Sequence, residues 1–341
     1  MRLLDRQARA NGPGDGKRPA AGLQWRYVWT KLTPWLLPIW FTMFAFQTFV
    51  YYVAHNLIGI DLAIYRHAGE VALAGGNPWI IDSNLAAFAG PPPTLLLYIP
   101  VSFLPLPVAT VLMMGAGALA AAWAINRLRL PLWWLLFPPL FEALIVGNPD
   151  AFILALLLVR GPMTGLAGVL KIYALVPIIL QRRTGALLVA IAVSALSLPQ
   201  WQHFIGSADV VGGVLGDSAH LSAWGTWLMV PVIAALWLLR RRGAEYLVVP
   251  GLWPNTRSQY GTMALIAVHR YPVAAAVIGL NSPYLPATAV IVMAIENWVR
   301  VRLLKIDPRT WTAEREASPA IEKASATESP QVDMRSGIPS G

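Results

Sequence analysis

Two long stretches without a charged side chain constrain the fold of this chain most. No Asp, Glu, Lys or Arg occurs between Leu32 and Ile60, or between Ser83 and Asn126. A bilayer span needs about 20 mainly apolar residues, so the first stretch accommodates one span and the second accommodates two. Charged residues make up only 13% of the chain, whereas soluble domains carry about 25%. We therefore predict an all-α, polytopic transmembrane protein.

Further apolar segments raise the predicted number of spans. They cover residues 131–146, 149–160, 162–180, 184–200 and 224–239, with shorter segments between 244 and 304. Several are shorter than a bilayer span, which is typical of broken helices that line a cavity. We expect about 10 to 12 membrane helices, in one transmembrane domain over residues 32–305. Residues 1–31 and 306–341, rich in Gly, Pro, Ser and charged side chains, are expected to be disordered.

The distribution of basic residues predicts the orientation in the membrane. Arg and Lys accumulate in residues 1–31 and around positions 181–183, 240–242 and 300–305, and loops rich in Arg and Lys stay on the cytoplasmic side. Arg127 and Arg129 fall on the outer side and count against this topology. We expect a multi-pass protein of the cell membrane with both termini cytoplasmic and an extracytoplasmic loop at 58–90. The formal net charge of +9 then needs no nucleic-acid partner.

Several classes of chemistry are excluded or disfavoured by composition and motifs. The chain has no cysteine, which excludes thiol nucleophiles and zinc–thiolate sites. The phosphate-binding, nucleophile-elbow and H-E-x-x-H signatures are absent from the sequence. A loop with two His and two Asp matches no recognised ligand spacing, so we expect no metal site and no bound cofactor; these residues are His203, Asp209, Asp217 and His220.

The segment from Ile58 to Trp79 places polar side chains directly after the first span. Asp61 heads this segment, and its apolar residues recur at helical spacing as far as Gly75-Gly76-Asn77-Pro78, which should end a helix. We predict a short amphipathic helix at the membrane interface. Asp61 either caps the N-terminus of this helix or belongs to an active site, and the residues alone leave both interpretations open.

Two other segments contain polar groups at unusual places. Lys171 lies in the middle of the apolar segment 161–180, and Glu142 lies inside the segment 137–146. An ionisable side chain at membrane depth is costly and usually faces a cavity or a partner. The alternative to a functional role is that these side chains extend to the membrane interface or pair with each other. Residues 253–260 form a polar, aromatic break that the topology places on the same side as Asp61.

The order of these segments resembles the GT-C glycosyltransferases, in particular the polyprenol-phosphate-mannose-dependent α-mannosyltransferases. That family has an Asp at the head of its first outer loop, in a pattern close to D-[FL]-x-x-Y, followed by G-x-N-P-[YW] and a Pro-rich start to the next span. The corresponding stretches here are "DLAIY", "HAGEVALAGGNPW" and "GPPPTLLLYIPVSFLPLP". Later stretches that correspond to the family are "GNPD", "AGVLKIYALVP" and "LWPNTRSQY". The resemblance covers about residues 35–305.

The resemblance implies an inverting transfer of a hexose, mannose in this family, from a polyprenyl-phosphate donor to a glycolipid or cell-envelope glycan among the membrane lipids. Asp61 would be the general base. Cations would neutralise the donor phosphate, and other polar or aromatic groups would bind the sugar; the substrate-binding candidates are Tyr65, Arg66, His67, Asn77, Lys171, Arg257, Gln259 and Tyr260.

Two other classes of function compete with this interpretation. In a transporter or lipid flippase, Lys171 and Glu142 would line the translocation path, although such folds often show repeated halves, which this sequence does not show. The third class is a membrane-embedded assembly subunit without catalysis.

Overall fold

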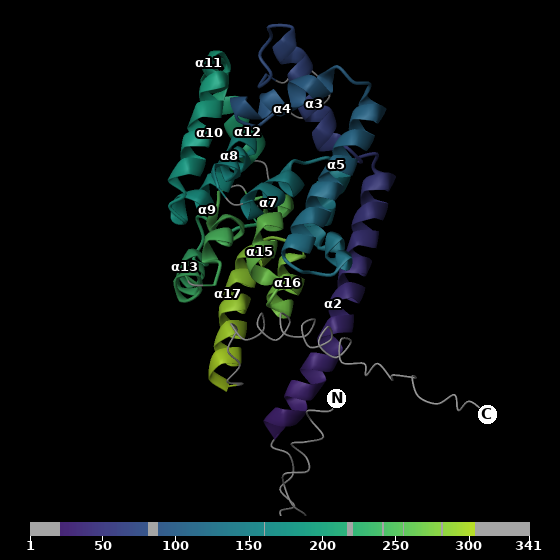
Figure 1. Cartoon of the computed structure of the whole chain (residues 1–341), viewed down its shortest axis with the longest axis vertical. Helices are drawn as coiled ribbons and strands as arrows, with labels where there is room; N and C mark the ends of the chain where they lie inside the picture. Colours follow the sequence, from purple (N-terminus) through teal and green to yellow (C-terminus); the bar gives the residue numbers. More distant parts are fainter. Residues whose placement is uncertain are drawn as a thin grey trace, which may run out of the picture. The chain divides into compact units, whose positions relative to one another are not determined.

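The structure is a computed structural model that describes residues 21–80, 88–159, 161–216, 221–240, 242–254, 256–280 and 282–303. All regular elements in these ranges are helices (Figure 1), which confirms the all-α class. The chain divides into two units at Glu296, and every residue of the site lies in the first unit. Residues 297–303 are the described part of the second unit and end in a short π-helix, Val299–Leu303.

Two helices are long and apolar enough to cross a membrane. The first is α2, Ala21–Ala54, in which residues 35–54 are apolar enough for a span, and the second is α5, Leu106–Arg127. Helices α10, Thr184–Leu196, and α11, Leu198–Gly206, form a bent pair, which adds a third span if the pair crosses the membrane as one. Exposed side chains on all three are large and apolar: Phe46 is 69% exposed, Val111 73% and Leu188 66%. In a bilayer these faces would contact lipid rather than water.

Helix α2 corrects one expectation from the sequence. Disorder was expected over residues 1–31, but α2 already begins at Ala21. Residues 23–33 contain neither Gly nor Pro, so nothing in the local sequence stops the helix from continuing in the N-terminal direction. Residues 1–20 and 304–341 lie outside the described ranges.

The other apolar segments are broken into short helices, as their lengths indicated. Segment 131–146 comprises η2, Leu132–Leu136, and α6, Pro138–Val146, and it is followed by α7, Asp150–Leu158. Segment 162–180 comprises η3, Pro162–Thr164, α8, Gly165–Leu170, η4, Ile172–Ala174, and α9, Leu175–Leu180. Prolines, which lack a backbone donor, begin or flank several of these pieces. The number of membrane helices stays a prediction.

The first loop folds largely as its local signals predict. Helix α3, Ile60–Leu73, ends before Gly75 and packs on α4, Leu95–Ser102, which follows η1, Pro92–Thr94 (Figure 1). The two helices are close because Gly69 faces the backbone of Tyr98, where an added Cβ would lie 3.0 Å from the carbonyl oxygen. The chain breaks between Ser102 and Leu106, at the predicted "LPLP". The stretch from Ser83 to Asn126 therefore contributes one span-length helix and a short one, not two spans, in its described part.

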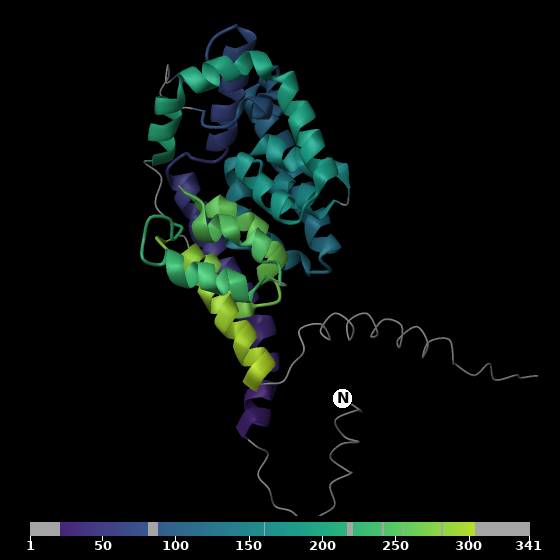
Figure 2. The ribbon, with the colours of Figure 1, turned by 90° about the vertical axis from the view of Figure 1, so that its left-hand side faces the viewer.

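The remaining elements complete the helical bundle around the site. Helices α10, α11 and α12, Ala208–Gly216, follow one another as an arch in Figure 2, with a bend of 80° between the first two. The later elements are α13, Met229–Leu238, η5, Ala244–Tyr246, α14, Val248–Leu252, η6, Ser258–Ala264, α15, Leu265–Val268, α16, Pro272–Ile278, and α17, Leu285–Trp298. The largest buried cluster joins residues of α2, α5, α7 and α17, and a second one surrounds the polar site.

Candidate active site

The start of helix α3 is fixed against the end of helix α6. Gly59, with φ +72°, precedes α3, and its N–H donates a 2.8 Å hydrogen bond to the carbonyl oxygen of Ile145. Gly59 is the N-cap residue and no side chain caps the helix. Asp61 therefore lies in the first turn without acting as a cap, so the capping interpretation of this residue does not apply.

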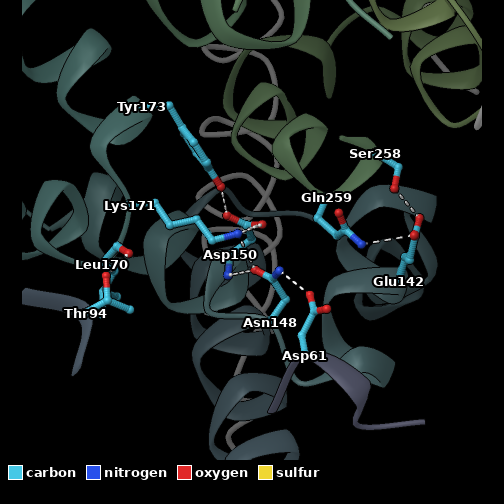
Figure 3. Close-up of polar contacts among 10 residues, drawn as sticks. All are labelled: Asp61, Thr94, Glu142, Asn148, Asp150, Leu170, Lys171, Tyr173, Ser258 and Gln259. Atoms are coloured by element: carbon cyan, nitrogen blue, oxygen red, sulfur yellow. Dashed lines mark hydrogen bonds and ion pairs between the residues drawn. The ribbon is translucent and has the colours of Figure 1, made fainter. Parts of the chain in front are cut away.

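A close approach between Gly147 and helix α3 brings the second segment of the site to Asp61. Gly147 ends α6 with φ +75°, and a Cβ at this position would lie 2.7 Å from the Cβ of Leu62. A glycine satisfies both requirements, since it tolerates positive φ and has no side chain. The next residue, Asn148, then donates a 2.6 Å hydrogen bond from Nδ2 to Oδ2 of Asp61 (Figure 3).

Asn148 also contacts a buried ion pair. Its Oδ1 accepts hydrogen bonds from Lys171 Nζ at 2.9 Å and from the backbone N–H of Asp150 at 3.2 Å. Lys171 Nζ lies 3.3 Å from Asp150 Oδ2, and the Tyr173 hydroxyl donates to the other oxygen of Asp150 (Figure 3). Asp150 is 2% exposed and Lys171 9%. The lysine is therefore paired in the interior, and its partner is Asp150 rather than Glu142 or the membrane interface.

Lys171 reaches this position because the chain leaves helical geometry there. Helix α8 ends at Leu170, and Lys171 adopts extended angles, φ −151° and ψ 129°, before η4 begins. A helix end leaves carbonyl groups without intrahelical partners. The buried hydroxyl of Thr94 donates to one of them, the carbonyl of Leu170, at 2.8 Å (Figure 3). The break thus directs the lysine inward and is supported by the segment that leads into α4.

Aromatic side chains surround the ion pair. The rings of Tyr173 and Tyr260 lie 4.0 Å apart between centroids, and Lys171 Nζ lies 5.1 Å from the centre of the Tyr260 ring. A cation over an aromatic face is attracted by the ring quadrupole. Two of the substrate-binding candidates, Lys171 and Tyr260, are therefore in direct contact, although they are far apart in the sequence.

A second tyrosine pair lies on the α3 side of the site. The rings of Tyr65 and Tyr98 lie 4.7 Å apart between centroids. Burial, with a smaller contribution from the negative charge of Asp61, raises the pKa of Tyr65 well above its usual value, so this hydroxyl stays neutral. Within the described ranges, the buried hydroxyl of Tyr98 has no hydrogen-bond partner.

Glu142 forms a second polar centre beside the first. It accepts hydrogen bonds from Tyr52 at 2.7 Å, from Ser258 at 2.6 Å and from Gln259 Nε2 at 3.1 Å. These donors come from α2 and η6, so the late polar segment is brought to the same region as Asp61 (Figure 3). The sequence alone leaves the role of Glu142 open, and no sequence pattern points to Tyr52 or Ser258.

Three of the predicted substrate-binding residues, Arg66, His67 and Asn77, make polar contacts within the protein. Arg66 donates from Nε to the carbonyl of Leu104 at 2.8 Å and pairs with Glu70 at 2.7 Å. His67 Nδ1 lies 3.6 Å from the same carboxylate, Glu70. The Arg66–Leu104 hydrogen bond connects α3 to the turn that follows α4. The contacts with Glu70 connect neighbouring turns of α3 itself. A direct role for Arg66 or His67 in binding substrate stays a prediction.

Asn77 also has both ends of its amide engaged. Its Nδ2 donates to Ser207 Oγ at 2.9 Å, and its Oδ1 accepts from the backbone N–H of Trp79 at 3.1 Å. The Asn-Pro-Trp motif therefore fixes the exit of the first loop against the junction of α11 and α12. Arg257, by contrast, is exposed, with one Nη2 contact of 3.5 Å to the carbonyl of Val214 in α12.

Sequence reasoning missed Asn148, Asp150 and Tyr173 as site residues. The available signals were the helix-breaking Gly-Asn-Pro-Asp stretch and the Tyr two positions after the intramembrane lysine. Each signal is weak alone, because the residues that form hydrogen bonds with one another in the site are 21 to 87 positions apart in the sequence. In the part of the chain that the structure describes, no three His, Asp or Glu side chains are grouped as metal ligands; Asp217 and His220 lie outside it.

The geometry suits Asp61 for accepting a proton. Asn148 holds Oδ2, whereas Oδ1 accepts no hydrogen bond from any described residue. A carboxylate in this state can accept the proton of a hydroxyl placed beside it. The neighbouring Lys171–Asp150 pair fixes the orientation of Asn148 and so the orientation of the carboxylate.

In a comparison with protein-family models, residues 88–198 match Glycosyltransferase family 87. No curated protein and no solved structure matches the chain. The matched third of the chain includes Asn148, Asp150, Lys171 and Tyr173, but neither Asp61 nor the segment 253–260. This partial match, together with the span-length helices, indicates a glycosyltransferase of the membrane, and the transporter alternative is not favoured.

Proposed function

We propose that the enzyme transfers a hexose, mannose by the resemblance stated above, from a polyprenyl-phosphate donor to a hydroxyl of a glycolipid or cell-envelope glycan. The observation that carries this proposal is the state of Asp61, whose Oδ2 is held by Asn148 at 2.6 Å while Oδ1 remains available to substrate. We further propose that the reaction takes place at the extracytoplasmic face, with both termini in the cytoplasm.

In the proposed reaction the acceptor oxygen attacks the anomeric carbon of the donor sugar. As the new C–O bond forms, the acceptor proton passes to Asp61 Oδ1. The bond between the anomeric carbon and the phosphate oxygen breaks, and its electron pair leaves with the polyprenyl phosphate. The attack from the opposite face inverts the anomeric configuration, so one carboxylate is sufficient where glycoside hydrolysis needs two.

The negative charge of the departing phosphate requires a cation. The charge of Lys171 is already balanced by Asp150 at 3.3 Å. Arg257 is exposed and adjoins Ser258 and Gln259, which contact Glu142 beside the site. We propose Arg257 as the principal phosphate-binding residue, since a guanidinium can form two parallel hydrogen bonds to a phosphate. Tyr65 and Tyr260 would then contact the sugar.

The experiment that tests the function is transfer of radiolabel from polyprenyl-phosphate mannose into membrane lipids. The wild-type chain is compared with Asp61→Asn, which removes the proton acceptor but preserves the shape of the side chain. Glu70→Gln is the matched control, because Glu70 lies on the same helix and pairs with Arg66 at the surface. We expect transfer to be lost in the first variant and retained in the second. Full transfer by Asp61→Asn would refute the assignment of the base, and no transfer by the wild-type chain would refute the donor.

A further inference from the structure

Arg257 is an exposed residue between buried neighbours. Thr256, before it, is fully buried, and its hydroxyl lies 2.6 Å from the carbonyl oxygen of Trp253 and 3.1 Å from that of Val249. Gln259, two positions after Arg257, is also buried. The guanidinium is therefore presented at the surface by a segment whose flanking residues are anchored inside the protein.

On its C-terminal side this segment is anchored to helix α6. Ser258 donates a 2.6 Å hydrogen bond to Oε2 of Glu142, and Gln259 donates a 3.1 Å hydrogen bond to Oε1 (Figure 3). Pro139, three residues before Glu142, packs closely on the same segment, since a Cβ added to Gly261 would lie 3.0 Å from its Cγ. Residues three apart on a helix share a face. One face of α6 thus holds the first part of η6 by hydrogen bonds and by close packing.

Glu142 is in turn fixed by helix α2, through the Tyr52 hydroxyl at 2.7 Å from Oε1. The three hydrogen bonds of this buried side chain do not require a negative charge. A neutral carboxyl group can accept from Tyr52 and Gln259 on its carbonyl oxygen and donate its proton to the Ser258 hydroxyl. Loss of the side chain would leave buried polar groups without a partner, which costs free energy.

Arg257 and the proposed base act on the same part of the site. The charges of Arg257 and Asp61 both influence the hydroxyl of Tyr260, and the Tyr260 N–H donates to the carbonyl oxygen of Arg257 at 3.1 Å. The contact between the guanidinium and the carbonyl oxygen of Val214, at 3.5 Å, is long for a hydrogen bond. A phosphate oxygen can replace it, because hydrogen bonds between two charged groups are stronger.

We propose that Glu142 is a positioning residue for the donor phosphate: by holding Ser258 and Gln259, it fixes the backbone from which Arg257 reaches the phosphate. The proposal rests on the function proposed above, because it assigns a supporting residue to the group that would bind the donor. A cation that is held in place before binding loses less conformational freedom when the phosphate arrives. Glu142 contacts no substrate in this account, so its effect passes through Arg257.

Binding of farnesyl phosphate to the purified full chain in lipid nanodiscs tests this role without requiring transfer. Farnesol, which has the same chain without the charge, is the second ligand, and binding to empty nanodiscs is subtracted. We expect the wild-type chain to bind the phosphate at least about tenfold more tightly than the alcohol, a difference of about 1.4 kcal/mol. Arg257→Ala should remove most of this preference.

Two substitutions of Glu142 separate positioning from general packing. Glu142→Leu removes all three hydrogen bonds and should weaken phosphate binding by about tenfold, with farnesol binding unchanged. Glu142→Gln should bind the phosphate within about threefold of the wild-type chain, because its amide oxygen can accept from Tyr52 and Gln259 while its nitrogen donates to Ser258. Equal losses for the two ligands would show a purely structural role and overturn the proposal.

A milder variant, Ser258→Ala, removes one hydrogen bond and keeps the Glu142 side chain. It should weaken phosphate binding by about threefold. The matched control is Ser197→Ala, which also removes the hydrogen bond of a buried serine, here 2.8 Å to the carbonyl oxygen of Ser194, and which should bind as wild type. Thermal unfolding of each variant establishes that folded proteins are compared. Phosphate binding by Ser258→Ala at the wild-type affinity would contradict the proposal.

A double-mutant cycle tests whether Glu142 acts through Arg257. In an Arg257→Ala background, Glu142→Leu should cause no further loss of phosphate binding, since coupled residues are not additive; additive losses would contradict this route. If Arg257→Ala loses the preference for phosphate while Glu142→Leu keeps it, the positioning role alone fails. A wild-type chain without that preference would instead refute the phosphate-linked donor.

Discussion

Asn148 donates a 2.6 Å hydrogen bond to Asp61, a residue 87 positions earlier in the chain, while its own Oδ1 accepts from Lys171 at 2.9 Å. This one amide therefore connects the carboxylate of the first loop to the buried ion pair of Lys171 and Asp150. Its orientation is determined by its neighbours, because the lysine can bind only the oxygen end of the amide and leaves the nitrogen end for Asp61.

Asn148→Ala should reduce transfer with little change in folding. The variant removes the donor that orients Asp61, and hydrogen bonds to charged groups contribute roughly 1.5–3 kcal/mol, so kcat/KM should fall about 10- to 100-fold. Asn126→Ala, at the exposed end of α5, is the control and should behave as wild type. Transfer by Asn148→Ala at the wild-type rate would show that Asp61 needs no orientation by this residue.

Gly147→Ala tests the close approach that assembles the site. The new Cβ would meet Leu62 at 2.7 Å in a backbone conformation with φ +75°. Gly75→Ala is the matched control, since Gly75 also has φ +75° but nothing within 4 Å of the added Cβ. Both variants should lose about 1 kcal/mol from the backbone strain. Gly147→Ala alone should lose further stability and also impair transfer. Thermal unfolding in detergent measures the stability, and radiolabel transfer measures the activity. Equal losses of stability in the two variants would show that the contact with Leu62 does not matter.

Lys171→Met tests the buried pair. Removal of the cation leaves Asp150, which is 2% exposed, as an uncompensated buried charge, and such a change costs roughly 3–5 kcal/mol. The double variant Lys171→Met, Asp150→Asn should recover most of this stability because no charge is left unpaired. Thermal unfolding of the three proteins in detergent measures the difference. A single variant as stable as wild type would contradict the account of the pair.

The absence of native cysteine allows the proposed topology to be tested with single introduced thiols. Glu70→Cys lies in the first loop and should react with a membrane-impermeant maleimide added to intact cells. Arg240→Cys, at an exposed position in a basic segment expected inside, should react only after the cells are opened. Glu70 is 41% exposed by side chain, so accessibility should not limit the reaction. The opposite pattern would reverse the orientation.

Local signals in the sequence were sufficient for several elements. The uncharged, apolar stretches predicted the long helices α2 and α5, because composition over about 20 residues decides whether a helix can lie in lipid. Gly75 and the "LPLP" stretch marked helix ends, because glycine and proline act on the backbone where they stand. Local signals failed for residues 21–31, where a basic and mixed composition concealed a helix that continues into α2.

The sequence by itself determined the all-helical class, the first-loop helix and the place of Asp61 at its head. Only the tertiary structure decided which groups meet that carboxylate: Asn148 rather than Arg66, with Lys171 held by Asp150. The physical reason is the range of the interactions involved. Helix formation depends on neighbours within a few residues, whereas the hydrogen bonds of the site join residues up to 117 positions apart. Those bonds depend on close packing at Gly147 and on the break at Lys171, which no local pattern specifies.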